Sequence, residues 1–344
     1  MWIWALGKYR SSLTKYTYNV TRLTIESRDR MKVSYMIATR NRRDELLKTL
    51  NSCRCQTYEH KEVHVVDDGS TDGTYEAVRN EFPEVIITRN DPNRGSVVSR
   101  NQIFARVTGE VLIGFDDDSR FIDAFATAQI VERFRQEPDL GLLEFQDIGP
   151  EYPERIPSDS HLRLKGERHI ASFGEGRYAV RRSVLEKVDG FVDFFWHSYE
   201  GPDLAIRIWD AGYRCVGWYA IIVWHEYSGT NRNEMRTHYF HARNELLSNL
   251  MRTPWLFILP LSLWRMFSQL RYSLRRGWWL IELRVWWDAF RMVPTALRHR
   301  QPVRIETFRR CLLLNRRWVS DSQAAWALGY SSYQKFKESP RQRQ

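Results

Sequence analysis

Acidic residues at one point of the chain have the spacing of a metal site. Asp116, Asp117 and Asp118 follow the apolar run 110–115, which predicts a buried strand. Alternate carboxylates in an extended turn point the same way, so Asp116 and Asp118 can bind one hard divalent cation, Mn²⁺ or Mg²⁺, through oxygen. The alternative is an acidic turn that caps a helix, because carboxylates stabilise the N-terminal end of a helix.

Two more polar clusters follow apolar runs earlier in the chain. Thr39 and Asn41 follow the run 33–38, and Asp67 follows the run 62–66. Each cluster on its own is compatible with a solvated turn. Three of them together favour a binding site, since a purely structural loop has no reason to concentrate carboxylates that repel one another.

Alternating strands and helices must position these clusters. The predicted strands cover residues 33–38, 62–66, 85–88 and 110–115, and the predicted helices cover residues 44–53, 74–82 and 95–107. This alternation predicts an α/β fold with a parallel sheet covered on both faces. Ligands of open α/β sheets bind outside the carboxyl ends of the strands, where all three polar clusters are expected.

The polar clusters belong to an ordered series of motifs. The first motifs cover residues 37–42, 65–73, 93–101 and 114–118, and later ones cover residues 174–176, 179–182, 188–191, 200–207 and 212–213, followed by His225. Over about residues 32–230 this series resembles glycosyltransferase family 2. The resemblance implies a GT-A fold, a Rossmann-like and mostly parallel sheet flanked by helices, with a C-terminal helical extension here.

The resemblance also implies an activity. It is the transfer of a sugar from a nucleoside diphosphate sugar to a hydroxyl of a glycan, a lipid-linked saccharide or a protein, with inversion and with Mn²⁺ or Mg²⁺. The donor-binding residues that it implies are Thr39, Asn41, Asp67, Arg94, Asp116 and Asp117. The implied metal ligands are Asp118, Asp116 and His225.

An inverting transfer needs a carboxylate that takes the proton of the acceptor hydroxyl. The candidates are Glu200 and Asp203, and the sequence departs from the common form of the family because Gly201 stands where a second carboxylate is usual. We favour Glu200, since Asp203 also suits a helix N-terminus whatever the chemistry. Gly201 keeps open the alternative of a non-catalytic sugar-nucleotide or glycan-binding protein on the same fold. A second alternative is a membrane-bound scaffold on this fold, whose C-terminal part binds a membrane or partners.

The C-terminal part of the chain differs in charge from the rest. Residues 251–344 hold 18 basic and 5 acidic residues, a net charge of +13, whereas residues 1–250 carry −3. Eight of the 14 Trp also lie after residue 250. Trp and Arg on amphipathic helices are typical of a surface that binds anionic lipid, and packing on the catalytic domain or on a second subunit of a homodimer is the alternative. Without a recognised nucleic-acid module, we expect no nucleic-acid partner.

Length and composition set the remaining expectations. With 344 residues and 43% hydrophobic residues, the chain can bury a sizeable core, which excludes a disordered or fibrous protein. We expect an N-terminal arm (1–31), a catalytic domain (32–245) and a basic helical extension (246–344). Four cysteines form no disulfide framework, and no leader pattern precedes the first charged residues. These features predict a cytoplasmic protein bound peripherally to the cytosolic face of a membrane.

Overall fold

The computed structural model describes residues 31–149, 167–226 and 233–315. By its internal contacts the chain divides into two units, Met1–Met31 and Lys32–Gln344. The description below concerns the second unit. Residues 1–30 of the expected arm (1–31) lie outside the described residues.

The first half of the sheet confirms the predicted alternation of strands and helices. Its parallel strands are β1 (Val33–Thr39), β2 (Lys61–Asp67), β3 (Ile86–Arg89) and β4 (Val111–Asp116), joined by α2 (Arg43–Arg54), α3 (Thr74–Glu81) and α4 (Ser96–Phe104). Every residue of β1 is buried or nearly so, as in a strand covered on both faces. The carboxyl ends of β1, β2 and β4 therefore meet at one edge of the sheet.

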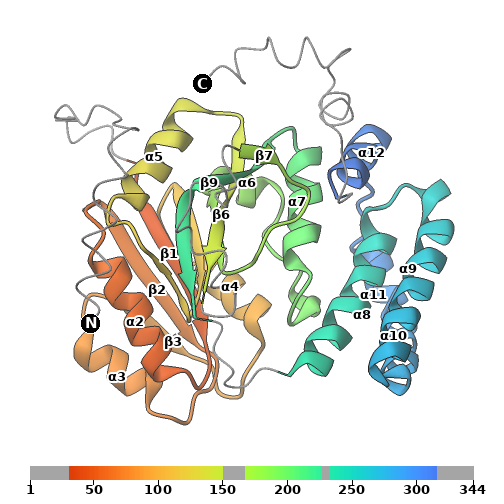
Figure 1. Cartoon of the computed structure of the whole chain (residues 1–344), viewed down its shortest axis with the longest axis horizontal. Coiled ribbons are helices and arrows are strands. Elements are labelled where there is room, and N and C mark those ends of the chain that lie inside the picture. The colour runs from red at the N-terminus through yellow and green to blue at the C-terminus, as the bar shows by residue number, and fades with distance from the viewer. Residues whose placement is uncertain (1–30, 150–166, 227–232, 316–344) are drawn as a thin grey trace. The chain divides into compact units, whose positions relative to one another are not determined.

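The second half of the sheet is mixed. It contains β5 (Ser119–Phe121), β6 (Leu140–Ile148), β7 (Glu167–His169), β8 (Arg177–Arg181) and β9 (Arg214–His225), and the strand order is β3-β2-β1-β4-β8-β6-β9-β5, with β7 paired to β9. Strand β8 runs antiparallel to β4, and β5 runs antiparallel to β9. The pairing of β5 with β9 matters for the site, because its register places His225 opposite Ser119, the residue that follows Asp118. The expected fold class, a sheet flanked by helices and followed by a helical extension, is confirmed (Figure 1).

Helices cover both faces of the sheet. One face packs on α2 and on α5 (Ala126–Gln136), which bury Leu46 and Ile130. The other face packs on α4, α6 (Arg182–Lys187) and α7 (Glu200–Asp210) in a continuous apolar cluster. Both faces are therefore shielded from water, and the strand ends remain as the place for a ligand.

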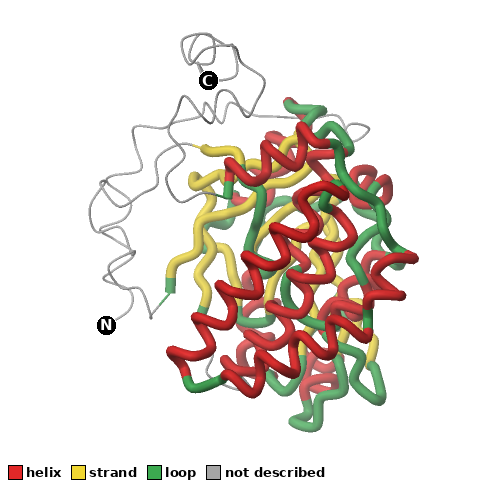
Figure 2. Tube along the Cα trace, turned by 90° about the vertical axis from the view of Figure 1, so that its right-hand side faces the viewer, coloured by secondary structure: helices red, strands yellow, loops and turns green. Residues whose placement is uncertain are grey.

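The C-terminal helices extend the second layer. They are α8 (Glu234–Arg252), α9 (Trp255–Arg276), α10 (Trp279–Arg291), α11 (Val293–Arg298) and α12 (Ile305–Leu314). Leu247, Ala296 and Cys311 from α8, α11 and α12 belong to the same apolar cluster as α7. Figure 2 views the molecule from the side of these helices, with the strands behind them. The expected domain boundary at residue 245 falls inside α8, which runs without a break from one part into the other.

In the part of the chain that the structure describes, every helix is too short or too polar to cross a bilayer.

A buried ion cluster joins α7 to α8. The Asp203 carboxylate, fully buried, accepts hydrogen bonds from Arg207 Nε at 2.8 Å, Arg252 Nε at 3.0 Å and Ser248 Oγ at 2.8 Å. Burial opposes ionisation, but Arg207 and Arg252 outweigh it and lower the pKa of Asp203. The charged carboxylate is therefore part of the folded structure at neutral pH, and its contribution is lost only when acid protonates it.

We expect Asp203→Asn to lower the free energy of unfolding by about 3–5 kcal/mol, because the substitution leaves two buried arginines without their counter-charge. Urea denaturation measures this loss. Asp210→Asn is the matched control on the same helix: Asp210 pairs with Arg304 at a partly exposed position, so its removal should cost less than about 1 kcal/mol. Equal losses for the two variants would contradict a structural role for the Asp203 cluster.

Candidate active site

A cavity of about 880 Å³ opens at the carboxyl ends of β1, β2 and β4. Strands β1 and β4 contribute Thr39 and Asp116 to its wall, the turn after β2 contributes Asp68, and the start of α7 contributes Glu200. Tyr272 of α9 and several residues of α8 also line it. The C-terminal helices thus complete a cavity that the strand ends begin.

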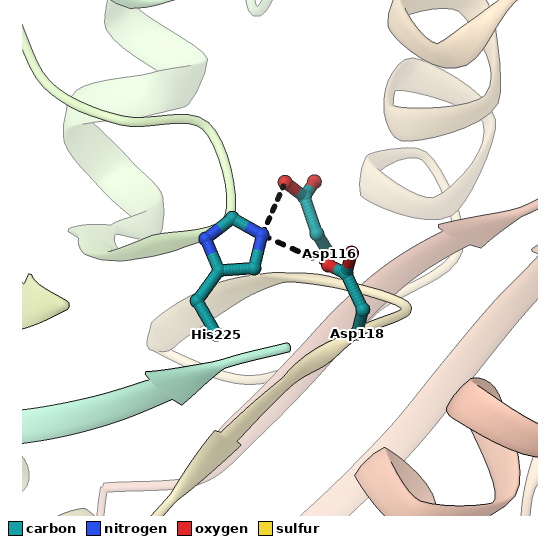
Figure 3. A group of neighbouring side chains, drawn as sticks. All are labelled: Asp116, Asp118 and His225. Atoms are coloured by element: carbon teal, nitrogen blue, oxygen red, sulfur yellow. Dashed lines mark ion pairs between the residues drawn. The ribbon is translucent and has the colours of Figure 1, made fainter. Parts of the chain in front are cut away.

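Asp116, Asp118 and His225 form a cluster that fits a metal ion (Figure 3). One ligand atom from each lies within 4.8 Å of the others. His225 Nε2 is 2.9 Å from Asp118 Oδ1 and 4.0 Å from Asp116 Oδ2. Two carboxylates and one imidazole are suitable ligands for Mn²⁺ or Mg²⁺. The β5–β9 pairing brings His225 to the acidic turn across more than 100 residues of chain.

Asp117, expected at the donor, lies in the wall of the cavity and holds the acidic turn in place. Its carboxylate accepts hydrogen bonds from Thr39 Oγ1 and Arg42 Nη1, both at 2.9 Å, and its carbonyl oxygen accepts one from Thr49 Oγ1 at 2.8 Å. Arg42 also reaches Asp118 Oδ2 at 3.3 Å. Burial raises the pKa of Asp117 to about 6, although Arg42 opposes the shift. Arg42 lines the cavity and binds two carboxylates of the acidic turn, and sequence reasoning did not single it out.

The second polar cluster contains two adjacent buried carboxylates, of which only the second lines the cavity. Asp67 is fully buried, where it accepts the Ser70 N–H at 2.8 Å and pairs with Arg89 Nε at 3.2 Å. Asp68, which follows it, lines the cavity and accepts the N–H groups of Arg94 and Gly95, both at 2.8 Å. Asp67 therefore shapes the turn, while Asp68 faces the cavity in its place.

Asn41 and Arg94 occupy different positions around the cavity. Asn41 lines it with a positive φ of 52°, and its Oδ1 accepts the Thr71 N–H at 2.7 Å, which ties the first two polar clusters together. The Arg94 side chain is exposed, and the structure does not place it among the residues that line the cavity.

Arg100 links the proton-accepting candidate to the metal cluster. Its guanidinium binds the Glu200 carboxylate through Nη1 and Asp116 Oδ1 through Nη2, the latter at 2.9 Å. Burial raises the pKa of Glu200, with Arg100 opposing the shift. The other candidate, Asp203, does not line the cavity and is engaged by the arginines described above. Sequence reasoning did not single out Arg100. Its position in the 93–101 motif, one of the ordered series of motifs, is the signal that could have identified it.

Part of the sequence around this cavity matches a model of a known protein family. Residues 34–189 match the family model described as Glycosyl transferase family 2. An uncharacterized glycosyltransferase of Nostoc sp. is 30% identical over 172 residues, which cover 46% of this chain and 53% of that protein. The chain thus spans about half the length of this curated relative.

Solved structures of glycosyltransferases share the fold. The mannosyltransferase PcManGT from Pyrobaculum calidifontis, in complex with GDP-Man and Mn²⁺, aligns with a TM-score of 0.53 and 19% identity over 90% of this chain and 87% of its own. A fragment of Staphylococcus aureus TarS in complex with UDP-GlcNAc aligns with a TM-score of 0.56 and 18% identity over 91% and 93%. Residues 34–189 thus resemble the family 2 glycosyl transferases in sequence, and the solved structures share the fold of the chain around them.

Proposed function

We propose that the protein transfers a sugar from a nucleoside diphosphate sugar to a hydroxyl group of an acceptor, with inversion and with a divalent metal ion. The observation that carries the proposal is the cavity at the strand ends, where Asp116, Asp118 and His225 face Glu200 across Arg100. The structures of similar fold that were solved with GDP-Man or UDP-GlcNAc support a nucleotide sugar as the donor.

The residues of the cavity have different roles in the proposed reaction. Asp116, Asp118 and His225 would hold Mn²⁺ or Mg²⁺, which stabilises the charge of a departing diphosphate when bound. Arg42 and Arg100 neutralise the carboxylates around that place, so the acidic turn keeps its shape. Thr39, Asn41 and Asp68 line the cavity beside them and suit the nucleoside part of the donor.

A non-catalytic protein that binds sugar nucleotides or glycans is the second candidate, because Gly201 stands where a second carboxylate is usual. A measurement of donor turnover distinguishes a transferase from a binding protein. A transferase cavity releases nucleoside diphosphate from its donor slowly even with water as acceptor, whereas a binding protein leaves the donor intact.

We expect a donor to stabilise the fold in the presence of metal. A thermal-shift screen of UDP-, GDP- and dTDP-sugars with Mn²⁺ or Mg²⁺ should find one that raises the melting temperature, because a ligand at 100 times its Kd stabilises the folded state by about 2.7 kcal/mol. EDTA should abolish the shift. If all these donors leave the melting temperature unchanged with either metal, the proposed donor class is wrong.

Asp118→Asn should weaken Mn²⁺-dependent donor binding by more than about 100-fold and leave the fold intact, since even partners in the outer shell of a metal site contribute 10–100-fold. Isothermal titration with and without Mn²⁺ measures the effect. Asp44→Asn removes an equivalent charge at an exposed position of α2 and should bind the donor as the wild type does. Undiminished Mn²⁺-dependent binding by the Asp118 variant would exclude this metal site.

We also propose that α9 and α10 attach the protein peripherally to an anionic membrane surface. Their apolar side chains are exposed at helical spacing, among them Leu256 at 80%, Leu259 at 68% and Phe267 at 66%. Exposed arginines such as Arg271 and Arg284 lie on the same two helices. Many large apolar side chains exposed on two helices are typical of an interaction site, and the net charge of +13 after residue 250 favours anionic lipid as the partner.

The triple variant Leu256→Ser, Leu259→Ser and Phe267→Ser should lose binding to vesicles that contain phosphatidylserine, because each buried side chain contributes about 1.5–3 kcal/mol. Cosedimentation measures this loss. High salt should release only part of the wild-type protein, since salt screens the arginines and leaves the apolar contribution.

The matched control replaces three exposed apolar residues of the catalytic domain, Ile86, Ile122 and Phe125, by Ser. This control should sediment with the vesicles as the wild type does. If the wild type ignores the vesicles and light scattering shows a dimer that the α9 variant abolishes, the surface is a subunit interface instead.

A further inference from the structure

A second carboxylate of the cavity lies in front of Gly201. Glu175 belongs to the segment between β7 and β8, and its side chain lines the cavity together with Glu200. A Cβ atom at Gly201 would lie 3.5 Å from Glu175 Oε1. The Glu175 carboxylate thus occupies the space in front of the first turn of α7, beside the residue that the sequence leaves without a side chain.

The backbone closes position 201 to any side chain. A Cβ there would lie 2.3 Å from the carbonyl oxygen of Phe173, a contact that real Cβ atoms do not make. The same segment that excludes a side chain at residue 201 carries Glu175 two residues later. Residue 201 therefore cannot supply a carboxylate, and Glu175 places one at this point of the cavity beside Glu200.

The two glutamates differ in their partners. Glu200 is 3% exposed, and its Oε1 is bound by Arg100, which also holds Asp116. Glu175 is partly exposed, and among residues 31–149, 167–226 and 233–315 no other residue forms a hydrogen bond or ion pair with its side chain. A carboxylate fixed by an arginine is a poorer proton acceptor than one that faces the cavity unpaired, since the arginine favours its charged form.

The electrostatic environment agrees with this difference. Burial and the neighbouring charge of Glu200 raise the pKa of Glu175, with Arg100 opposing the shift. A raised pKa brings a carboxylate nearer to the value at which a general base is most effective at neutral pH.

We propose that Glu175 is the proton acceptor of the transfer and that Glu200 is a positioning residue that holds Arg100. The inference rests on the proposed function. The acceptor oxygen forms a bond to the anomeric carbon of the donor sugar while the bond from that carbon to the diphosphate oxygen breaks. The electron pair leaves with the nucleoside diphosphate, and the proton of the acceptor hydroxyl passes to the Glu175 carboxylate.

The test compares Glu175→Gln with the wild type in the presence of Mn²⁺. The donor is the one among UDP-GlcNAc, UDP-glucose, UDP-galactose and GDP-mannose that the wild type hydrolyses fastest. With water as acceptor, Glu175→Gln should release nucleoside diphosphate at least about 100-fold more slowly, the usual contribution of a positioned base. Its donor affinity should stay within about threefold, and Glu175→Asp should recover part of the rate.

Azide separates proton transfer from a structural effect. Because the azide anion attacks without losing a proton, Glu175→Gln should form glycosyl azide within about threefold of the wild-type rate. Glu200→Gln should instead weaken donor binding, since it frees Arg100 from one of its two partners. Glu186→Gln, at an exposed position of α6, is the matched control and should behave as the wild type.

Two results would overturn the assignment of Glu175 while the proposed function stands: hydrolysis by Glu175→Gln at the wild-type rate, or an equal loss of hydrolysis and azide transfer. Release of no nucleotide by the wild type from any of the four donors, under conditions in which the protein is folded, would count against the proposed function itself.

Discussion

Five carboxylates at the acidic turn and beside Arg100 are the constraint on which the rest of the structure depends. Asp116, Asp117, Asp118, Glu175 and Glu200 repel one another, so they can stay together only with cations among them. Arg42 binds Asp117 and Asp118, and Arg100 binds Asp116 and Glu200. Two arginines do not balance the charge of five carboxylates, so negative charge remains at this edge of the sheet. A divalent cation and the proton of an acceptor hydroxyl would neutralise this charge.

The elements around the cavity serve to hold these charges at fixed distances. The parallel strands β1 and β4 bring Thr39 beside the acidic turn, and the antiparallel pair β5 and β9 brings His225 to it. Close packing leaves little freedom near the turn: a Cβ at Gly176 would lie 2.4 Å from Asp116 Oδ2. The site is therefore rigid on the sheet side, as a preorganised electrostatic site must be.

The C-terminal helices have one face that is buried and one that is exposed to solvent. Their inner face is core, because Leu247, Ala296 and Cys311 pack in the cluster that covers the sheet and Arg252 neutralises Asp203. Their outer face, on α9 and α10, presents large apolar side chains to solvent. The sequence left open whether these helices pack on the catalytic domain or bind a membrane or a second subunit. Helices α8, α11 and α12 pack on the catalytic domain, whereas α9 and α10 leave large apolar side chains exposed. The same helices also reach the cavity through Tyr272 and Arg276.

The sequence by itself determined the strands and helices of the first half, the polar clusters at their ends and the family resemblance, because hydrophobic period and turn residues are local properties. Only the tertiary structure decided which member of each cluster faces the cavity: Asp68 lies there and Asp67 does not, and Glu200 lies there and Asp203 does not. It also decided the mixed order of the second half of the sheet and the meeting of Arg100, Glu175 and Gly201. These contacts join residues far apart in the chain, so no local pattern specifies them, and burial and charge compensation in the folded state select them.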